Sequence, residues 1–173
     1  RNGVISIMSE LRTNRIIPRD GLPSGSAGGI IQVKQTVDSS SSSQITGTSY
    51  QDAGSLNVSI TPTRSDSKIL IMATTNIQAF VSSQEVSGGL RLLRGSSEII
   101  EYPYAFVMEA GTSGGSRIFY NTNHSATFLD SPSTTSAVTY KVQLKLYSTS
   151  NGMKLVYNQN NSKSTILVME VSG

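Results

Sequence analysis

The chain has 173 residues and a formal net charge of +3, and only 14% of its residues are charged, against about 25% in an average soluble protein. Serine and threonine replace the missing charge, with 30 Ser and 16 Thr, while the chain has no Cys and one His. This composition excludes a coiled coil, a Cys/His metal site and a disulfide framework, and no apolar run reaches the roughly 18 residues of a transmembrane helix.

Residues 1–29 are predicted to form an extended docking arm and a hinge. The hinge is the Gly/Ser-rich stretch at 24–29, a composition that is typical of flexible linkers. The residues before Pro18 are pushed towards extended geometry, and an extended arm cannot bury its apolar side chains by itself. We therefore expect the arm to contact other protein through Leu11, Arg12, Arg15, Ile16, Ile17, Arg19 and Leu22.

The rest of the chain, residues 30–173, has the alternating apolar pattern of β-strands. Strands are predicted at 30–37, 56–61, 68–81, 90–95, 98–102, 117–120, 125–129, 138–148, 153–157 and 164–171. The serine-rich stretch 38–44, residues 82–89, residues 103–116 and residues 158–163 are predicted to be loops or irregular, and Asn151-Gly152 is a hairpin-turn dipeptide. No segment shows a helical apolar period. We therefore expect an all-β, antiparallel β-sandwich of about nine strands, similar to a jelly roll.

The sequence shows no convincing set of catalytic residues. His124 precedes Ser125 and lies near Asp130, but thirty serines make such a coincidence common, and no Gly-x-Ser-x-Gly motif occurs. Glu98 and Glu101 would point to opposite faces of one strand, which is poor geometry for a glycosidase pair. The Gly-Gly dipeptides precede no helix that could bind a phosphate. We expect no enzyme activity, no cofactor and no metal site.

Binding is the function that the sequence favours. Loops that carry Tyr, Asn and Ser make adaptable contacts with sugars and proteins. The candidate receptor-contact residues are Tyr102, Tyr104, Tyr120, Asn121, Asn123 and His124, all predicted in or beside loops. Lysine and arginine are spread thinly, without a basic block, so neither nucleic-acid binding nor membrane insertion is expected.

Five segments resemble small structural proteins of tailed phages, often phages of cyanobacteria. They are SELRTNRIIPRDGLP at residues 9–23, GGIIQVKQ at 28–35, LNVSITP at 56–62, SKILI at 67–71 and TFLDSPSTTSAVTYKV at 127–142. The similarity covers most of the chain from about residue 9, but it does not extend to residues 96–124. These segments carry no active-site residue.

The resemblance implies a virion component of tail-fibre type, often a trimer with a β-sandwich head. The N-terminal arm would attach it to other virion proteins, and the sandwich would contact a polysaccharide or a protein of the host surface. Three alternatives remain open at this stage. They are a capsid decoration or cement protein of the same fold, a carbohydrate-binding module and a hydrolase.

Overall fold

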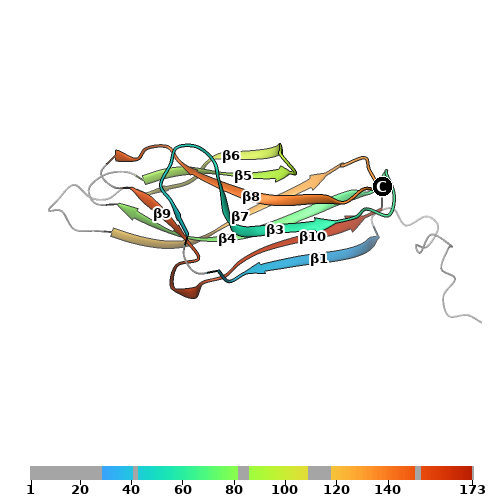
Figure 1. The fold of residues 1–173 in the computed structure, drawn as a ribbon, viewed down its shortest axis with the longest axis horizontal. Helices are drawn as coiled ribbons and strands as arrows, with labels where there is room; N and C mark the ends of the chain where they lie inside the picture. Colours follow the sequence, from blue (N-terminus) through green and yellow to red (C-terminus); the bar gives the residue numbers. More distant parts are fainter. Residues whose placement is uncertain (1–28, 41–42, 82–85, 109–117, 151–152, 173) are drawn as a thin grey trace, which may run out of the picture.

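The computed structural model describes residues 29–40, 43–81, 86–108, 118–150 and 153–172 (Figure 1). These residues form strands and one short 3-10 turn, η2 (Gln159–Asn161), and no described helix is long and apolar enough to cross a membrane. The strands are β1 (Ile30–Asp38), β2 (Ser43–Ile45), β3 (Gln51–Ile60), β4 (Lys68–Val81), β5 (Val86–Arg94), β6 (Ser97–Met108), β7 (Ile118–Asp130), β8 (Val138–Leu146), β9 (Lys154–Tyr157) and β10 (Ser164–Val171).

The strands form two antiparallel sheets. Sheet A has the order β1-β10-β4-β7, and the short strands β9 and β2 extend it beside the second half of β4. Sheet B has the order β3-β8-β5-β6. Without β2 and β9, the eight long strands counted in chain order give sheets 1-8-3-6 and 2-7-4-5. This is the strand order of a jelly roll, so the expected antiparallel sandwich is confirmed.

The sheets pack face to face through the apolar half of each alternating strand. In β3 the buried side chains include Leu56, Val58 and Ile60, and in β8 every second residue from Tyr140 to Leu146 is buried. Sheet A contributes the buried side chains of β4 and β10, such as Ile71 and Val168. The period of two in the sequence therefore identifies the core-facing side chains directly.

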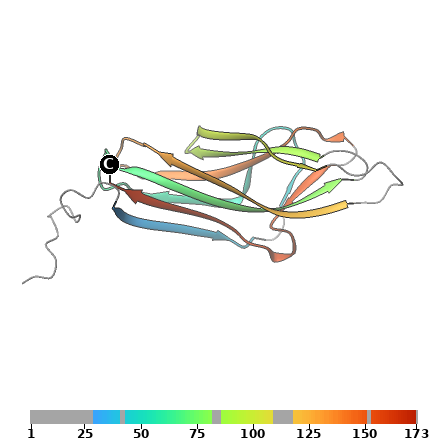
Figure 2. The same ribbon diagram turned by 180° about the vertical axis from the view of Figure 1, so that it is seen from behind.

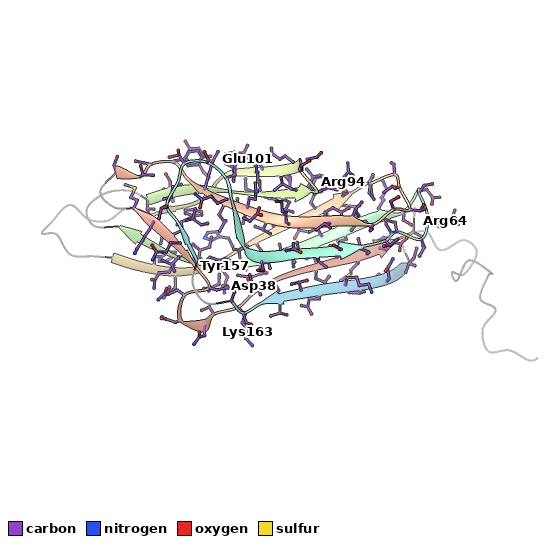
Figure 3. All side chains as sticks on the ribbon, in the orientation of Figure 1. Asp38, Arg64, Arg94, Glu101, Tyr157 and Lys163 are labelled. Atoms are coloured by element: carbon purple, nitrogen blue, oxygen red, sulfur yellow. The ribbon has the colours of Figure 1, made fainter. Side chains whose placement is uncertain are left out.

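Two buried carboxylates, Asp38 and Asp130, connect strands of sheet A with strands of sheet B. Asp38, at the end of β1, accepts hydrogen bonds from the Tyr157 hydroxyl (2.9 Å) and from the backbone nitrogen of Ser55 (2.8 Å) in β3, and Figure 3 shows Asp38 beside Tyr157. Asp130, at the end of β7, accepts from the Tyr140 hydroxyl at 2.7 Å and pairs with Arg94 at 2.9 Å. Each carboxylate therefore links one sheet to the other.

The structure corrects several strand boundaries. Asp38 is buried at the end of β1, and β2 begins at Ser43, inside the serine-rich stretch predicted to be an exposed loop. β5 begins at Val86, although residues 82–89 were predicted to be a loop. β6 continues through Pro103 to Met108, and β7 is one strand of 13 residues where two short strands were predicted.

Two other predicted features fall outside the described residues. Apart from Gly29, the predicted arm at residues 1–29 lies there, and so does the predicted turn dipeptide Asn151-Gly152. The arm and its docking residues therefore remain a prediction. The loop after β9 is confirmed: it contains η2, and Asn158, Asn160 and Asn161 adopt positive φ angles that asparagine tolerates well.

Candidate binding groove between two sheet edges

The candidate site lies where the edge strand of sheet B, β6, approaches the edge strand of sheet A, β7. Figure 2 shows β7 in gold beside β4 in green, seen from behind the view of Figure 1. Two cavities of about 330 and 230 Å³ adjoin here and share Ala105 and His124. We call them together the β6–β7 groove. Its lining residues are Ile77, Ala79, Leu90, Tyr102, Pro103, Tyr104, Ala105, Phe106, Val107, Tyr120, Thr122, His124 and Ser125.

His124 occupies the centre of this groove, between the two cavities. Its ring hydrogen-bonds to the backbone of Ala105 and lies 5.4 Å from the Phe106 ring, measured between centroids. Burial lowers the pKa of His124, and the Ala105 bond opposes this shift without cancelling it. The other ring nitrogen, Nε2, is buried and has no hydrogen-bond partner among the described residues. The imidazole that lines both cavities therefore holds this unpartnered nitrogen below the surface.

Pro103 explains how β6 shapes its side of the groove. Proline cannot donate a ladder hydrogen bond and is confined to edge strands and bulges, and the pairing of β5 with β6 shifts register between Gly88 and Leu90. Beside this shift Tyr104 is 69% exposed, and it stacks on Tyr147 with ring centroids 4.7 Å apart. Tyr102 donates from its hydroxyl to the Thr127 carbonyl oxygen of β7 (3.1 Å), which bridges the two edges.

Four of the six predicted receptor-contact residues line the groove: Tyr102, Tyr104, Tyr120 and His124. They lie on the two edge strands, where the sequence had placed them in or beside loops. Tyr120 is 53% exposed. Aromatic rings and a few polar atoms are the usual lining of a site for a small ligand.

Asn121 and Asn123 do not line the groove. They alternate with the groove residues along β7 and therefore point to the outer face of sheet A. There Asn123 accepts a hydrogen bond from Asn76 (2.9 Å), and Asn121 accepts one from Gln78 (2.9 Å), both across the β4–β7 pair. The loop prediction failed because β4 supplies amide partners that the sequence of β7 alone does not reveal.

Sequence reasoning missed a polar and aromatic cluster on the outer face of sheet B. The Arg91 guanidinium lies 4.2 Å from the Tyr50 ring centre, and Lys145 Nζ lies 4.4 Å from the same centre. The Tyr50 hydroxyl donates to Glu101 (2.7 Å), which also pairs with Lys145 (3.1 Å). Burial and the neighbouring Glu101 carboxylate raise the pKa of Tyr50. Only the alternation of Lys141, Gln143 and Lys145 in β8 signalled this face.

Glu98 and Glu101 reach this same cluster, although their spacing predicted opposite faces. Glu98 pairs with Arg91 at 2.8 Å. The expected alternation fails because the β5–β6 pairing shifts register between Leu92 and Leu93, so the strand between the two carboxylates does not keep a strict period of two. Both carboxylates are engaged with cations on sheet B.

The residues considered for a catalytic triad have separate partners. His124 bonds to the backbone of Ala105, the Ser125 hydroxyl faces that of Thr74 at 3.4 Å, and Asp130 bonds to Tyr140 and Arg94. Across the described ranges, no three His, Asp or Glu residues gather in a way that could hold a metal ion. The predicted docking residues Leu11, Arg12, Arg15, Ile16, Ile17, Arg19 and Leu22 lie outside the described residues.

Comparison with known proteins finds no matching protein family and no matching curated protein. Among solved structures, the VP2 subviral particle of infectious bursal disease virus is 10% identical with a TM-score of 0.39, over 83% of this chain and 38% of VP2. The Gt strain of that virus gives 11% identity and a TM-score of 0.36, over 94% and 43% of the two chains.

A third similar structure is the insecticidal delta-endotoxin Cry8Ea1 from Bacillus thuringiensis, at 11% identity and a TM-score of 0.33. The aligned region covers 76% of this chain and 20% of the endotoxin. This chain thus spans less than half the length of each of these three proteins.

Proposed function

We propose that this chain is a non-enzymatic structural protein of a phage virion, of tail-fibre type, that contacts the host surface through the β6–β7 groove. The observation that carries the proposal is the groove itself. Tyr102, Tyr104 and Tyr120 line its two cavities together with His124, on the edge strands of the two sheets. Rings beside a few polar atoms suit the apolar faces and hydroxyl groups of a polysaccharide.

The proposed assembly is a homotrimer attached to other virion proteins through residues 1–29. A closed three-fold assembly would cover exposed sheet edges without open-ended growth. The resemblance of residues 9–23 to the opening segments of phage structural proteins supports the attachment role. A mass measurement of the purified protein tests the trimer, and a monomer at micromolar concentration would contradict it.

The host-contact role predicts the effect of removing the two exposed groove tyrosines. Each partly desolvated aromatic contact is worth about 0.5–1.5 kcal/mol beyond its buried area, so Tyr104→Ala with Tyr120→Ala should weaken retention on host envelope fractions by at least about tenfold. The measurement is a pull-down of the full chain with lipopolysaccharide and with outer-membrane protein fractions.

Leu129→Ala is the matched control for this experiment, because it removes an exposed large side chain outside the groove. It should leave retention unchanged. Equal retention of the double variant and the original chain would exclude the groove as the contact site. Electron microscopy of the intact particle tests the location, since density confined to the capsid lattice would contradict a tail fibre and favour a decoration protein.

A further inference from the structure

The outer face of sheet A is apolar at one end. Directly paired residues share a face, so the strand registers define rows that cross the sheet. One row consists of Val33, Met169, Leu70 and Leu129, and the next consists of Gln35, Leu167, Met72 and Thr127. Four apolar side chains at this end of the face are each between 46% and 56% exposed: Ile30, Val33, Met72 and Leu129.

Other described parts of the outer faces of the two sheets are more polar. Further along sheet A the rows become Thr74 with Ser125 and then Asn76 with Asn123. The outer face of sheet B carries ion pairs such as Lys145–Glu101. Contiguous exposed apolar area on a soluble protein marks a surface that something covers. We therefore expect another apolar protein segment to cover this patch.

The position of the patch indicates the occupant. Its rows lie at the end of the sandwich where β1 begins, and the Gly29 carbonyl there accepts a hydrogen bond from Ser172 (3.0 Å). Figure 1 shows β1 beginning at the same end as the C-terminus. Residues 1–28 enter at this point, and their sequence carries Ile16, Ile17 and Leu22 before a Gly/Ser-rich stretch.

The linker length matches the width of the patch. Leu22 is seven residues from Gly29, and a flexible chain of that length has a root-mean-square reach of about 15 Å. From β1 across β10 and β4 to β7 is three strand spacings, or about 14 Å. Effective concentration is highest when the reach of a linker matches the span it must cross. Leu22 of the same chain is thus better placed than a group on a second molecule.

We propose that residues 1–28 fold back in the free protein and cover the apolar end of the outer face of sheet A, with Leu22 on the Val33–Leu129 row. On this proposal, the surface is a binding site for the N-terminal segment of the same chain. The proposal concerns the protein before any partner binds and does not depend on the proposed virion function.

A cysteine-pair experiment tests the proposal, because the natural chain contains no cysteine. Ser24→Cys is combined with Lys68→Cys, which lies on the same face in a row with Ile30 and Val171. The matched control combines Ser24→Cys with Thr61→Cys, at the sheet B edge, where the Thr61 carbonyl contacts Gln32 of β1. Both pairs use the full chain, and both reporter positions are exposed and near the start of β1.

Under mild oxidation, the Lys68 pair should form an intramolecular disulfide at least about fivefold faster than the Thr61 pair. Leu22→Asp in the segment, or Leu129→Asp on the exposed face, should remove this difference while circular dichroism shows an intact fold. Equal rates for the two original pairs would overturn the proposal. A covalent dimer in place of the monomeric product would also overturn it, and would assign the face to a second copy.

Discussion

His124 is the single residue whose ionisation couples most directly to the β6–β7 groove. It is the only histidine in the chain, and its ring joins the groove side of β7 to the backbone of β6 at Ala105. Because burial lowers its pKa, the folded protein holds it neutral under conditions in which an exposed histidine begins to protonate. Protonation would place a charge at this partly buried position beside the Phe106 ring.

Acidification should therefore destabilise the fold through His124. The unfolded chain gains a proton near its ordinary pKa of about 6.5, whereas the folded chain resists protonation until lower pH. Stability contributed by neutral His124 is thus present above pH 6.5 and is lost as the pH falls below it. Urea midpoints at pH 7.5 and 5.5 should differ more in the original chain than in His124→Gln. Identical pH dependence would contradict this assignment.

Gly88 shows why a glycine can be required inside a strand. A Cβ atom at this position would clash with the Phe106 ring and with the Lys145 carbonyl. Gly88→Ala should therefore destabilise the protein by about 1–3 kcal/mol, the usual cost of overpacking a core. Ser97→Ala, at an exposed position in the same sheet, should change stability by less than about 0.5 kcal/mol. Chemical denaturation of the two variants measures the difference.

At the scale of single strands, those in which buried and exposed residues alternate regularly were predicted from the sequence, and the others were missed in part. The strands at 56–61 and 138–148 were found because one face is buried and the other is mostly polar. The strand at 164–171 also alternates in burial, but its outer face carries Leu167 and Met169. β5 was missed at its start because Gly88 and Gly89 normally indicate a turn. The middle of β7 reads Asn-Thr-Asn-His, and it becomes a strand because β4 pairs with it from end to end.

Two tyrosine hydroxyl groups connect β7 to sheet B, and we predict how much each contributes to stability. Tyr140→Phe removes the buried hydrogen bond to Asp130 and leaves that carboxylate with fewer partners, so the free energy of unfolding should fall by about 1–3 kcal/mol. Tyr102→Phe removes the more exposed bond to the Thr127 carbonyl and should cost less than about 1 kcal/mol. Equal stability of the two variants would contradict the expectation that the Tyr140–Asp130 hydrogen bond stabilises the contact between the sheets.

For the molecule as a whole, the sequence predicted the architecture well and the lining of the candidate groove only in part. Period-two patterning is a local property, and it was enough to identify two layers around a shared core. The groove depends on which two edges meet, and that is a property of strand order. Residue type singled out Tyr102, Tyr104, Tyr120 and His124, which line the candidate groove, whereas Asn121 and Asn123 bond to partners on β4.

Two buried carboxylates, Asp38 and Glu170, predict the acid sensitivity of the whole sandwich. Glu170 in β10 accepts hydrogen bonds from Gln32 (2.6 Å) and from the backbone nitrogen of Thr63 (2.7 Å). Burial raises the pKa of Asp38 and of Glu170, but hydrogen bonds outweigh it and lower both below their ordinary values of 3.8 and 4.5. The stability that these two ionised carboxylates contribute is fully present above their ordinary pKa values. It is lost as the pH falls through their lowered pKa values in the folded protein. Glu170→Gln should be less stable at pH 7 and should lose less stability between pH 5 and 3, as denaturant midpoints would show.

The pairing of β1 with β10 has a consequence for how the protein is made. Ile30 lies opposite Val171, and β10 separates β1 from β4 throughout sheet A. During synthesis, β1 leaves the ribosome among the first strands but has no ladder partner until β10 follows. Closing so long a loop is slow and leaves the edges of β1 and β4 uncovered meanwhile. We therefore expect nascent chains to associate with one another most readily before the last strand of the sheet arrives.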